Sequence, residues 1–367
     1  MEVLGLSWPA VAVTAVWLAI LLVPWQPWRN REVLEAEPGA PEDLSDVTVL
    51  IPARDEAAVI GTTLAALAEQ GENLQVVVVD DASSDGTGDI ARNFAGLEIT
   101  VVQSQPLQEG WSGKLWALEQ GRRQVKTPLT LLLDADIQLR PGLIAAIRRQ
   151  RREKNVAFLS LMASLRMENF WEKLLLPAFV YFFKLLYPFA LANSSSRRFA
   201  AAAGGCILVD TRLLAEIGGF DAIRGALIDD CALAHAVKKA GYRTWMGLSR
   251  GVVSLRRQER LADVWNMVAR TAFTQLRYSV ALLFLCTGLM TVLFWLPLLG
   301  LFGDLGYAFA FAGMTLSFVP TLGFYGLSLF WALFLPLTAG LYLAMTWSSA
   351  LRYWRGERSR WKGRVYR

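Results

Sequence analysis

Two aspartate pairs stand where the chain leaves a run of apolar residues, and carboxylates in that position can do chemistry. Asp134 and Asp136 occur in LLLDADIQL. Asp80 and Asp81 follow four valines in VVVVDDASSDGT. Carboxylates clustered at the end of a strand repel each other unless a cation or hydrogen-bond donors balance them. Such hard oxygen ligands suit Mg²⁺ or Mn²⁺, which proteins usually share with substrate phosphates. The DAD pattern therefore predicts either a metal-assisted phosphate site or an ordinary turn and helix cap.

A third pair, Asp229 and Asp230, lies in ALIDDCALAHAV (226–237) beside Cys231 and the single histidine of the chain, His235. Cys231 and His235 are four residues apart and would share a helix face, where they could bind a metal or react as a pair. Pairs at this spacing rarely have the direction that a catalytic hydrogen bond needs, and no second histidine can complete a zinc site. We therefore expect Cys231 and His235 to pack the helix, which leaves the aspartates as candidates.

Other polar residues near strand ends have a functional and a structural interpretation. PARDE (52–56) places Arg54 and Glu56 after an apolar run, and Asp85 could bind a ligand or cap the next helix. Lys114 in GWSGK enters a helix, where it can meet a phosphate. Its spacing does not fit the P-loop pattern, and G-x-G-x-x-G does not follow the first strand, so neither of these nucleotide motifs is supported.

Short apolar runs alternate with helical patterns around these residues. This alternation predicts an α/β domain at 47–260 with a mostly parallel sheet covered on both faces. Ligands of such sheets lie beyond the carboxyl ends of the strands, where the acids stand. The expected strands are 47–53, 74–83, 98–104 and 129–136, and the expected helices are 54–70, 87–94 and 113–125.

The chain as a whole is too apolar for a wholly soluble protein, with 54% hydrophobic residues and a mean hydropathy of +0.34. Trp8 to Trp28 is uncharged and is long enough to cross a bilayer, which needs about 20 apolar residues. We expect an N-terminal transmembrane anchor at 1–30, an acidic proline-rich linker at 31–46, and two or three transmembrane helices at 261–351. The three cysteines show no paired spacing, so a disulfide framework is not expected.

Basic residues flank the apolar segments, at Arg29, Arg31 and in a tail at 352–367, and they predict a cytoplasmic side for both flanks. Three C-terminal spans would put the tail on the other side, so two spans with one re-entrant or interfacial piece are favoured. The stretch 170–192 is expected to lie in the membrane interface, because a span there would separate the strands from the later aspartates. The formal charge of +5 fits contact with anionic lipids better than with nucleic acid.

Six blocks of the sequence carry a family resemblance. In chain order they are VTVLIPARDEAAVIGTTLAAL, VVVVDDASSDGT, GKLWAL, LLLDADIQLRPG, GGCILVDTRLLAEIGGFD and IDDCALAHAVKKAGY. Together they resemble the family 2 glycosyltransferases with the GT-A fold, which is Rossmann-like. The resemblance covers about residues 47 to 255. Within the family, the chain is most similar to hopanoid-biosynthesis-associated membrane glycosyltransferases, as well as to bacterial carotenoid and glycolipid glycosyltransferases.

The resemblance implies a role for each matching residue. Asp136, with Asp134, would hold Mg²⁺ or Mn²⁺ on the donor diphosphate, and Asp80 and Asp85 would support the nucleotide turn. Gly204 and Gly205 would let the backbone approach the sugar and acceptor. The residues implied for binding a nucleotide-sugar are Pro52, Arg54, Glu56, Asp81, Lys114, Asp134, Gly204, Gly205 and Arg277.

Where the family has Glu-Asp, this chain has Asp229 and Asp230, so the resemblance implies Asp230 as the general base with Asp229 as its partner. One base without a covalent nucleophile fits inversion at the anomeric carbon. TQLRY (274–278) departs from the Q-x-x-R-W of processive relatives: Arg277 is kept, but threonine and tyrosine replace glutamine and tryptophan. This departure favours transfer of a single sugar. Alternatively, Arg277 could be an arginine at the membrane edge that extends its charged group towards water.

The expected function is inverting transfer of one sugar, from a UDP-sugar by resemblance, to a hydroxyl of a membrane lipid such as a hopanoid or another isoprenoid. The expected location is the bacterial inner membrane, with several spans and the catalytic domain facing the cytoplasm. A processive polysaccharide synthase and a carotenoid or glycolipid glycosyltransferase are the alternatives within this chemistry. A nucleotidyltransferase would share the metal aspartates without needing the IDD base, and a non-enzymatic scaffold would need neither.

Overall fold

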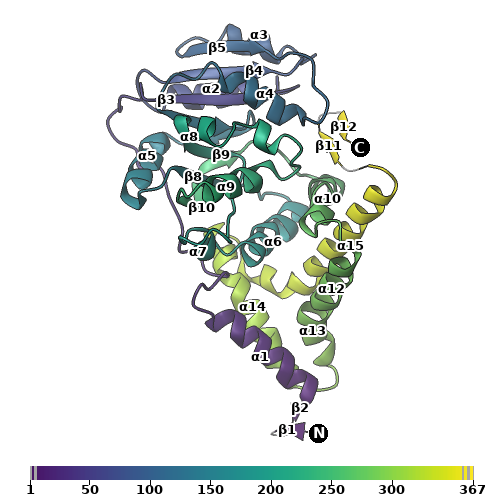
Figure 1. Ribbon diagram of the computed structural model, residues 1–367. Helices are drawn as coiled ribbons and strands as arrows, with labels where there is room; N and C mark the ends of the chain where they lie inside the picture. The colour runs from purple at the N-terminus through teal and green to yellow at the C-terminus, as the bar shows by residue number, and fades with distance from the viewer. Residues whose placement is uncertain (1, 4–5, 358, 362–363, 367) are drawn as a thin grey trace.

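The computed structural model describes residues 2–3, 6–357, 359–361 and 364–366. Figure 1 shows an α/β domain at one end, a layer of helices beneath it, and a narrow group of apolar helices at the other end, next to the N-terminus. Of the predicted basic tail, Arg358, Lys362 and Arg367 lie outside the described residues.

The α/β domain is built on an eight-stranded sheet in the order β5-β4-β3-β6-β9-β8-β10-β7. β5, β4, β3 and β6 are parallel, as predicted. β9 pairs antiparallel with β6 and β8, and β7 pairs antiparallel with β10, so the second half of the sheet is mixed. The strands are β3 (Val47–Ala53), β4 (Gln75–Asp80), β5 (Glu98–Gln103), β6 (Leu129–Leu133), β7 (Ile137–Leu139), β8 (Phe158–Ser164), β9 (Cys206–Asp210) and β10 (Thr244–Ser254).

Helices cover both faces of this sheet, which explains why its central strands read as continuous apolar runs. Along β3, Val49 and Ile51 enter one buried core and Leu50 enters the other. The first core includes residues of α2 (Ile60–Ala68), α3 (Thr87–Arg92) and α5 (Leu143–Lys154). The second includes residues of α4 (Gly113–Arg122), α8 (Thr211–Glu216) and α9 (Asp229–Lys239).

Beneath the sheet, α6 (Phe170–Leu186) and α7 (Phe189–Ala192) form the middle layer with α10 (Leu261–Ala269) and α11 (Ala272–Gln275). α6 begins with a capping box between Asn169 and Glu172 and buries an apolar face against the C-terminal helices. The Tyr181 hydroxyl lies 2.6 Å from the Ser317 hydroxyl, and the Tyr342 hydroxyl donates to the Leu175 carbonyl at 2.9 Å. The stretch predicted to be interfacial therefore lies between the domain and the apolar helices.

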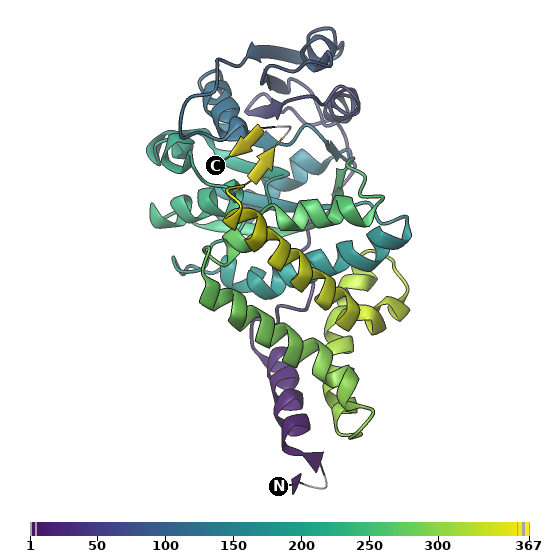
Figure 2. The same cartoon turned by 90° about the vertical axis from the view of Figure 1, so that its right-hand side faces the viewer.

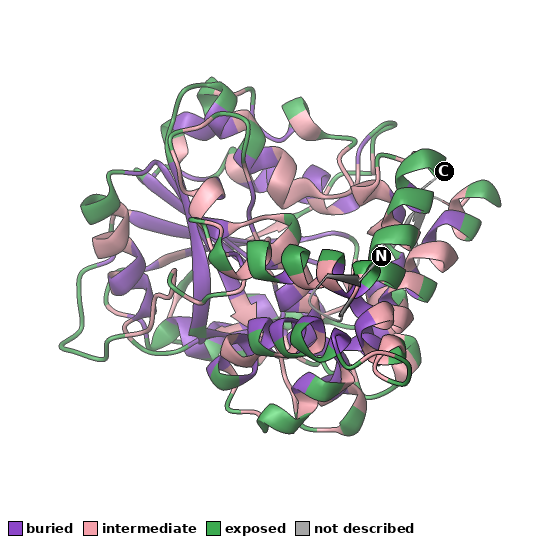
Figure 3. Ribbon diagram, turned by 90° about the horizontal axis from the view of Figure 1, so that it is seen from below, coloured by how far each residue is buried: buried purple, intermediate pink, exposed green. Residues whose placement is uncertain are grey.

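Three segments of the described residues are long and apolar enough to cross a membrane: Val280–Gly300, Tyr307–Phe324 and Leu329–Trp354. The first contains α12 (Val280–Met290), a π-helical turn and α13 (Leu296–Gly300); the second is α14, and the third ends with α15 (Leu335–Trp354). Seen from below, their outer surfaces are largely exposed (Figure 3). Exposed apolar side chains on this part include Phe284, Leu289, Leu299, Phe302, Leu305 and Phe309.

At the N-terminus, the uncharged stretch Trp8 to Trp28 forms a helix only over Trp8–Leu22, labelled α1. Pro24 ends it, because a residue before proline is pushed out of the helical region, and Val23 has a ψ of 140°. Fifteen residues of helix span about 22 Å, less than the roughly 30 Å of a bilayer core.

The apolar helices form a hairpin whose turn lies at the far end from the sheet. Asp304, the charge between the two apolar stretches, caps this turn by accepting from the backbone nitrogens of Ser7 at 3.0 Å and Gly306 at 2.7 Å. α14 then returns, and Phe324 packs near β10. α15 runs obliquely beneath the domain towards the C-terminus (Figure 2). This arrangement fits two membrane spans, Val280–Gly300 and Tyr307–Phe324, with α15 as one oblique helix.

Candidate active site

Lys114 is the centre of the candidate site. Ser112 caps α4 by accepting from the Leu115 nitrogen at 3.3 Å, which places Lys114 in the first turn of the helix. The Lys114 Nζ lies 2.8 Å from Asp134 Oδ1 and 3.5 Å from Asp229 Oδ2. These three residues line one pocket with Pro52, Gly204, Asp230 and several apolar side chains. The structure thus brings together residues from the ends of β3 and β6 and the starts of α4 and α9, as the sequence predicted.

One ammonium group and three carboxylates line this pocket. Burial by itself lowers the pKa of Lys114, but the carboxylates of Asp134, Asp229 and Asp230 outweigh it, so that the pKa is raised. Burial raises the pKa of Asp134, against the opposing effect of Lys114. Lys114 is therefore a permanently charged ammonium group surrounded by acids, and it could turn towards an anionic ligand.

Asp230 lies against Gly204 at the start of α9. A Cβ at Gly204 would lie 3.4 Å from both Asp230 Oδ2 and Lys114 Nζ, so glycine keeps the space between them open. The Gly205 carbonyl accepts from the Asp134 nitrogen at 3.1 Å. Burial, followed by the charge of Asp229, raises the pKa of Asp230 to about 7. A carboxylate with this pKa can accept a proton near neutral pH.

Asp136 pairs with a residue that the sequence analysis missed. Arg256, two residues after β10, donates from Nε to Asp136 Oδ2 at 2.7 Å and from Nη2 to Glu56 Oε1 at 3.2 Å. The Leu255 nitrogen donates to the Asp136 carbonyl at 2.8 Å, which holds the two segments together. The adjacent arginines of SLRRQER were a signal, but nothing in the sequence related them to a residue 120 positions earlier.

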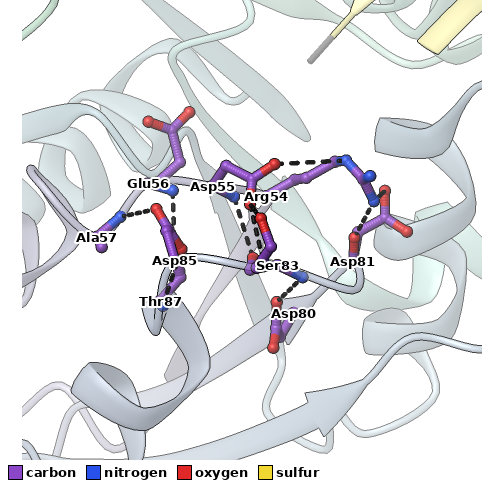
Figure 4. A network of polar contacts seen from close by, with 10 residues as sticks. Arg54, Asp55, Glu56, Ala57, Asp80, Asp81, Ser83, Asp85 and Thr87 are labelled. Carbon is purple, nitrogen blue, oxygen red and sulfur yellow. Dashed lines mark hydrogen bonds and ion pairs between the residues drawn. The ribbon is translucent and has the colours of Figure 1, made fainter. Parts of the chain in front are cut away.

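The loops after β3 and β4 hold each other through a network of polar contacts (Figure 4). Arg54 Nη1 donates to the Asp81 carbonyl at 2.5 Å and lies 3.7 Å from the Asp81 carboxylate. Asp85 accepts from the nitrogens of Ala57 at 2.9 Å and Thr87 at 3.0 Å, and Asp80 accepts from the Ser83 nitrogen at 3.0 Å. Asp80 and Asp85 thus shape the loops that carry Arg54 and Asp81.

The side of Asp230 towards the helical layer contains a second pair that the sequence analysis missed. The Tyr187 hydroxyl donates to Gln275 Oε1 at 2.5 Å, joining the end of α6 to α11. Tyr187 packs in the same apolar cluster as Cys231. Burial, with the neighbouring Cys231 and Asp230, raises the pKa of Tyr187. The sequence analysis missed Gln275 because the Q-x-x-R-W pattern has its glutamine one position earlier, where this chain has Thr274.

Arg277 is not brought to this cluster. It is exposed, it lines none of the pockets described above, and among the described residues it forms no ion pair. Its φ of 52° and that of Tyr278, 56°, place both in the left-handed region, at the turn before α12. Its role at the diphosphate stays a prediction.

Cys231 and His235 do not form a pair. The Cys231 thiol donates to the Ala202 carbonyl at 3.5 Å, and burial raises the pKa of this thiol, which disfavours a reactive thiolate. His235 is exposed on the same helix. Cys231 and His235 therefore belong to the helix that carries the aspartates, without forming a reactive pair.

The acids offer oxygen ligands of the kind that Mg²⁺ and Mn²⁺ prefer. Within the described part of the chain, however, no group of three or more His, Cys, Asp or Glu side chains is arranged to hold a metal ion. Asp134 is paired with Lys114 and Asp136 with Arg256. Asp134 and Asp136 could hold a divalent cation only together with further ligands, such as the oxygens of a bound phosphate group.

Comparisons with known proteins identify relatives of this chain. A 4,4'-diaponeurosporenoate glycosyltransferase of Staphylococcus haemolyticus is 31% identical over 98 residues, 27% of this chain and 26% of the relative. One from Staphylococcus aureus (strain USA300) is 33% identical over 91 residues, 25% of this chain and 24% of the relative. The match thus spans about a quarter of each curated relative.

Among solved structures, a mannosyltransferase from Pyrobaculum calidifontis, in complex with GDP-Man and Mn²⁺, is similar over 95% of this chain and 99% of its own. The TM-score is 0.55 at 20% identity, which shows a shared fold. The family model described as "Glycosyltransferase like family 2" matches residues 45–274, more than half of the chain. The protein therefore belongs to the family 2 glycosyltransferases and has their GT-A fold.

Proposed function

We propose that this glycosyltransferase transfers a single sugar, with inversion, from a nucleotide-sugar to a hydroxyl of a membrane lipid such as a hopanoid or another isoprenoid. The observation that carries the proposal is the position of Asp230. This partly buried acid, with a pKa of about 7, lines the pocket around Lys114 and Asp134, and its neighbour Cys231 packs with Tyr187 at the end of α6.

The donor would bind across the carboxyl ends of β3, β4 and β6. The loop residues Arg54, Glu56 and Asp81 would contact the nucleoside, and the Lys114 ammonium group would contact the diphosphate. A divalent cation on Asp136 and Asp134, when bound, would neutralise charge on the departing diphosphate. UDP is the nucleotide that the family resemblance favours.

Asp230 would remove the proton of the acceptor hydroxyl as that oxygen attacks the anomeric carbon. Gly204 leaves room beside the carboxylate for the sugar. Asp229 raises the proton affinity of Asp230 by its charge, and it also holds Lys114. A single displacement with one base inverts the anomeric centre.

The acceptor would approach from the helical layer, past Tyr187 and Gln275. α6, α7 and α11 lie on that side, and their apolar residues continue into α14 and α15. A lipid could then present its hydroxyl to Asp230 while its chain stays in the membrane. We place the protein in the bacterial inner membrane with its catalytic domain in the cytoplasm, where nucleotide-sugars are made.

A carotenoid is the second candidate acceptor. The curated relatives named above are diaponeurosporenoate glycosyltransferases, and they match this chain at 31% and 33% identity. An elongated apolar acceptor of that class would use the same approach past α6 and α11.

The test is reconstitution of the full-length protein in vesicles that contain a hopanoid alcohol, a polyprenol or a carotenoid acid. Each vesicle type receives UDP- and GDP-sugars separately, and the lipids are analysed by mass spectrometry. We expect one acceptor to gain the mass of a single sugar. Ladders of several sugars would instead indicate a processive synthase, and the absence of any glycosylated lipid would contradict the proposal.

A further inference from the structure

Arg256 bridges two acids of the proposed donor site. Its Nε lies 2.7 Å from Asp136 Oδ2, and its Nη2 lies 3.2 Å from Glu56 Oε1. The Asp136 side chain is 13% exposed, whereas the Arg256 side chain is 49% exposed. The guanidinium group therefore covers a buried carboxylate from the solvent side.

The backbone around this contact is fixed on both sides. Asp136 lies between β6 and β7, and its carbonyl accepts from the Leu255 nitrogen. Two residues after Arg256, the Gln258 nitrogen donates to the buried Glu172 carboxylate at 3.1 Å. The long Arg256 side chain can thus change its partner while the backbone that carries it stays in place.

A guanidinium group and a divalent cation compete for the same carboxylate oxygens. Both are positive and repel each other at short range, so binding of one to Asp136 weakens binding of the other. A diphosphate offers a guanidinium group paired oxygens in the bidentate geometry that arginine prefers. The alternative partner is therefore supplied by the donor itself.

We propose that Arg256 occupies the cation-binding carboxylates of the donor-free enzyme and exchanges them for the donor diphosphate when the cation binds. The second half of this proposal rests on the proposed function, because it takes the ligand to be a nucleoside diphosphate. Binding of metal and donor would then be coupled: the cation alone binds weakly, and the diphosphate strengthens its binding by giving Arg256 another partner.

The first experiment measures Mn²⁺ binding to the full-length protein in detergent without nucleotide, by electron paramagnetic resonance. Arg256→Gln should bind Mn²⁺ about tenfold more tightly than the natural protein, because one charge-assisted contact no longer competes. The Mn²⁺ affinity of Arg256→Lys should lie between those of Arg256→Gln and the natural protein. Arg257→Gln is the matched control: this neighbour pairs with Glu259 at 3.3 Å, and its substitution should change nothing. Equal or weaker Mn²⁺ binding by Arg256→Gln would overturn the proposal.

The second experiment repeats the titration with UDP, and separately with GDP, at saturating Mn²⁺. Arg256→Gln should bind the favoured nucleotide at least about fivefold more weakly than the natural protein, since a bidentate contact is lost. Unchanged nucleotide affinity would overturn the exchange onto the diphosphate. If the natural protein bound neither nucleotide while Arg256→Gln still bound Mn²⁺ more tightly, the proposed donor would be wrong, but the competition at Asp136 would stand.

Discussion

At the scale of single residues, the site depends on two bridges between a cation and an acid, Lys114 with Asp134 and Arg256 with Asp136. The first was predictable, because both residues stand at strand or helix ends that a parallel sheet brings together. The second was not, because pairing across the sheet depends on where β10 is inserted. Asp85, for which the sequence left two roles open, accepts from the Thr87 nitrogen at the start of α3.

The raised pKa of Asp230 predicts how transfer depends on pH. A general base works when it is deprotonated, so the transfer rate should rise as the pH rises through about 7 and level off above it. Stability depends on pH in the opposite sense to the transfer rate. The contribution of Asp230 to the free energy of unfolding is present below its ordinary pKa of 3.8 and is lost as the pH rises through about 7. Transfer that is independent of pH between about 6 and 8 would contradict the assignment.

Lys114→Gln should weaken nucleotide-sugar binding at least about tenfold, because it removes a partly buried positive charge and leaves Asp134 and Asp229 without it. Isothermal titration with UDP or GDP measures this loss. Lys126→Gln removes an exposed lysine at the opposite end of the sheet and serves as the control. Equal losses in both variants would show a general effect of charge and not a contact at the site.

At the scale of elements, the alternation of strands and helices predicted β3 to β6 and the helices between them. The positions of β8, β9 and β10 were not predicted, because their order and direction depend on pairing between distant segments. β9 lies antiparallel between β6 and β8 and ends the parallel half of the sheet. This insertion brings Gly204 and Gly205, just before β9, next to Asp134 and Asp230.

The start of α6 depends on Glu172, which is fully buried. Its carboxylate accepts from the nitrogens of Glu168, Asn169 and Gln258. Glu172→Ala should lower the free energy of unfolding by about 1–3 kcal/mol, because buried donors lose their partner. Thermal unfolding in detergent checks this against Glu168→Ala, whose side chain is 67% exposed. A smaller loss in Glu172→Ala than in the control would contradict this role.

The contact between α11 and the end of α6 should affect the acceptor and not the donor. Tyr187→Phe removes the hydroxyl that binds Gln275. The KM for the lipid should then rise about fivefold or more, which is the usual effect of losing one hydrogen bond to a substrate or to a group that positions it. Hydrolysis of the donor by water should be unchanged. Tyr242→Phe is the control, since that hydroxyl donates to Glu216 elsewhere. An equal effect on donor hydrolysis would mean that Tyr187 only supports the fold.

At the scale of the whole molecule, the sheet and the turn between α13 and α14 lie at opposite ends (Figure 1). Composition predicted which segments are apolar but not their arrangement, because hydropathy alone does not distinguish a span from an oblique helix. Pro24 ends α1 early, and α15 packs on α10 and α11 instead of extending to the tip.

This arrangement predicts opposite sides of the membrane for two introduced cysteines. A thiol reagent that cannot cross the membrane should label Gly303→Cys in intact cells, and should label His235→Cys only after lysis. The natural protein is the control, since Cys206 is buried and the other two thiols are half-buried. Labelling of both variants in intact cells, or of neither, would contradict the arrangement.

The most direct test of the account is a comparison of Asp230→Asn with the natural protein in the same lipid vesicles. Lipid transfer should fall by about 10²- to 10⁴-fold, the usual contribution of a general base, while binding of the nucleotide-sugar is kept. Asp221→Asn, at an exposed position whose carboxylate pairs with Arg224 at 3.3 Å, should transfer normally. Full lipid transfer by Asp230→Asn would contradict the assignment of Asp230 as the base.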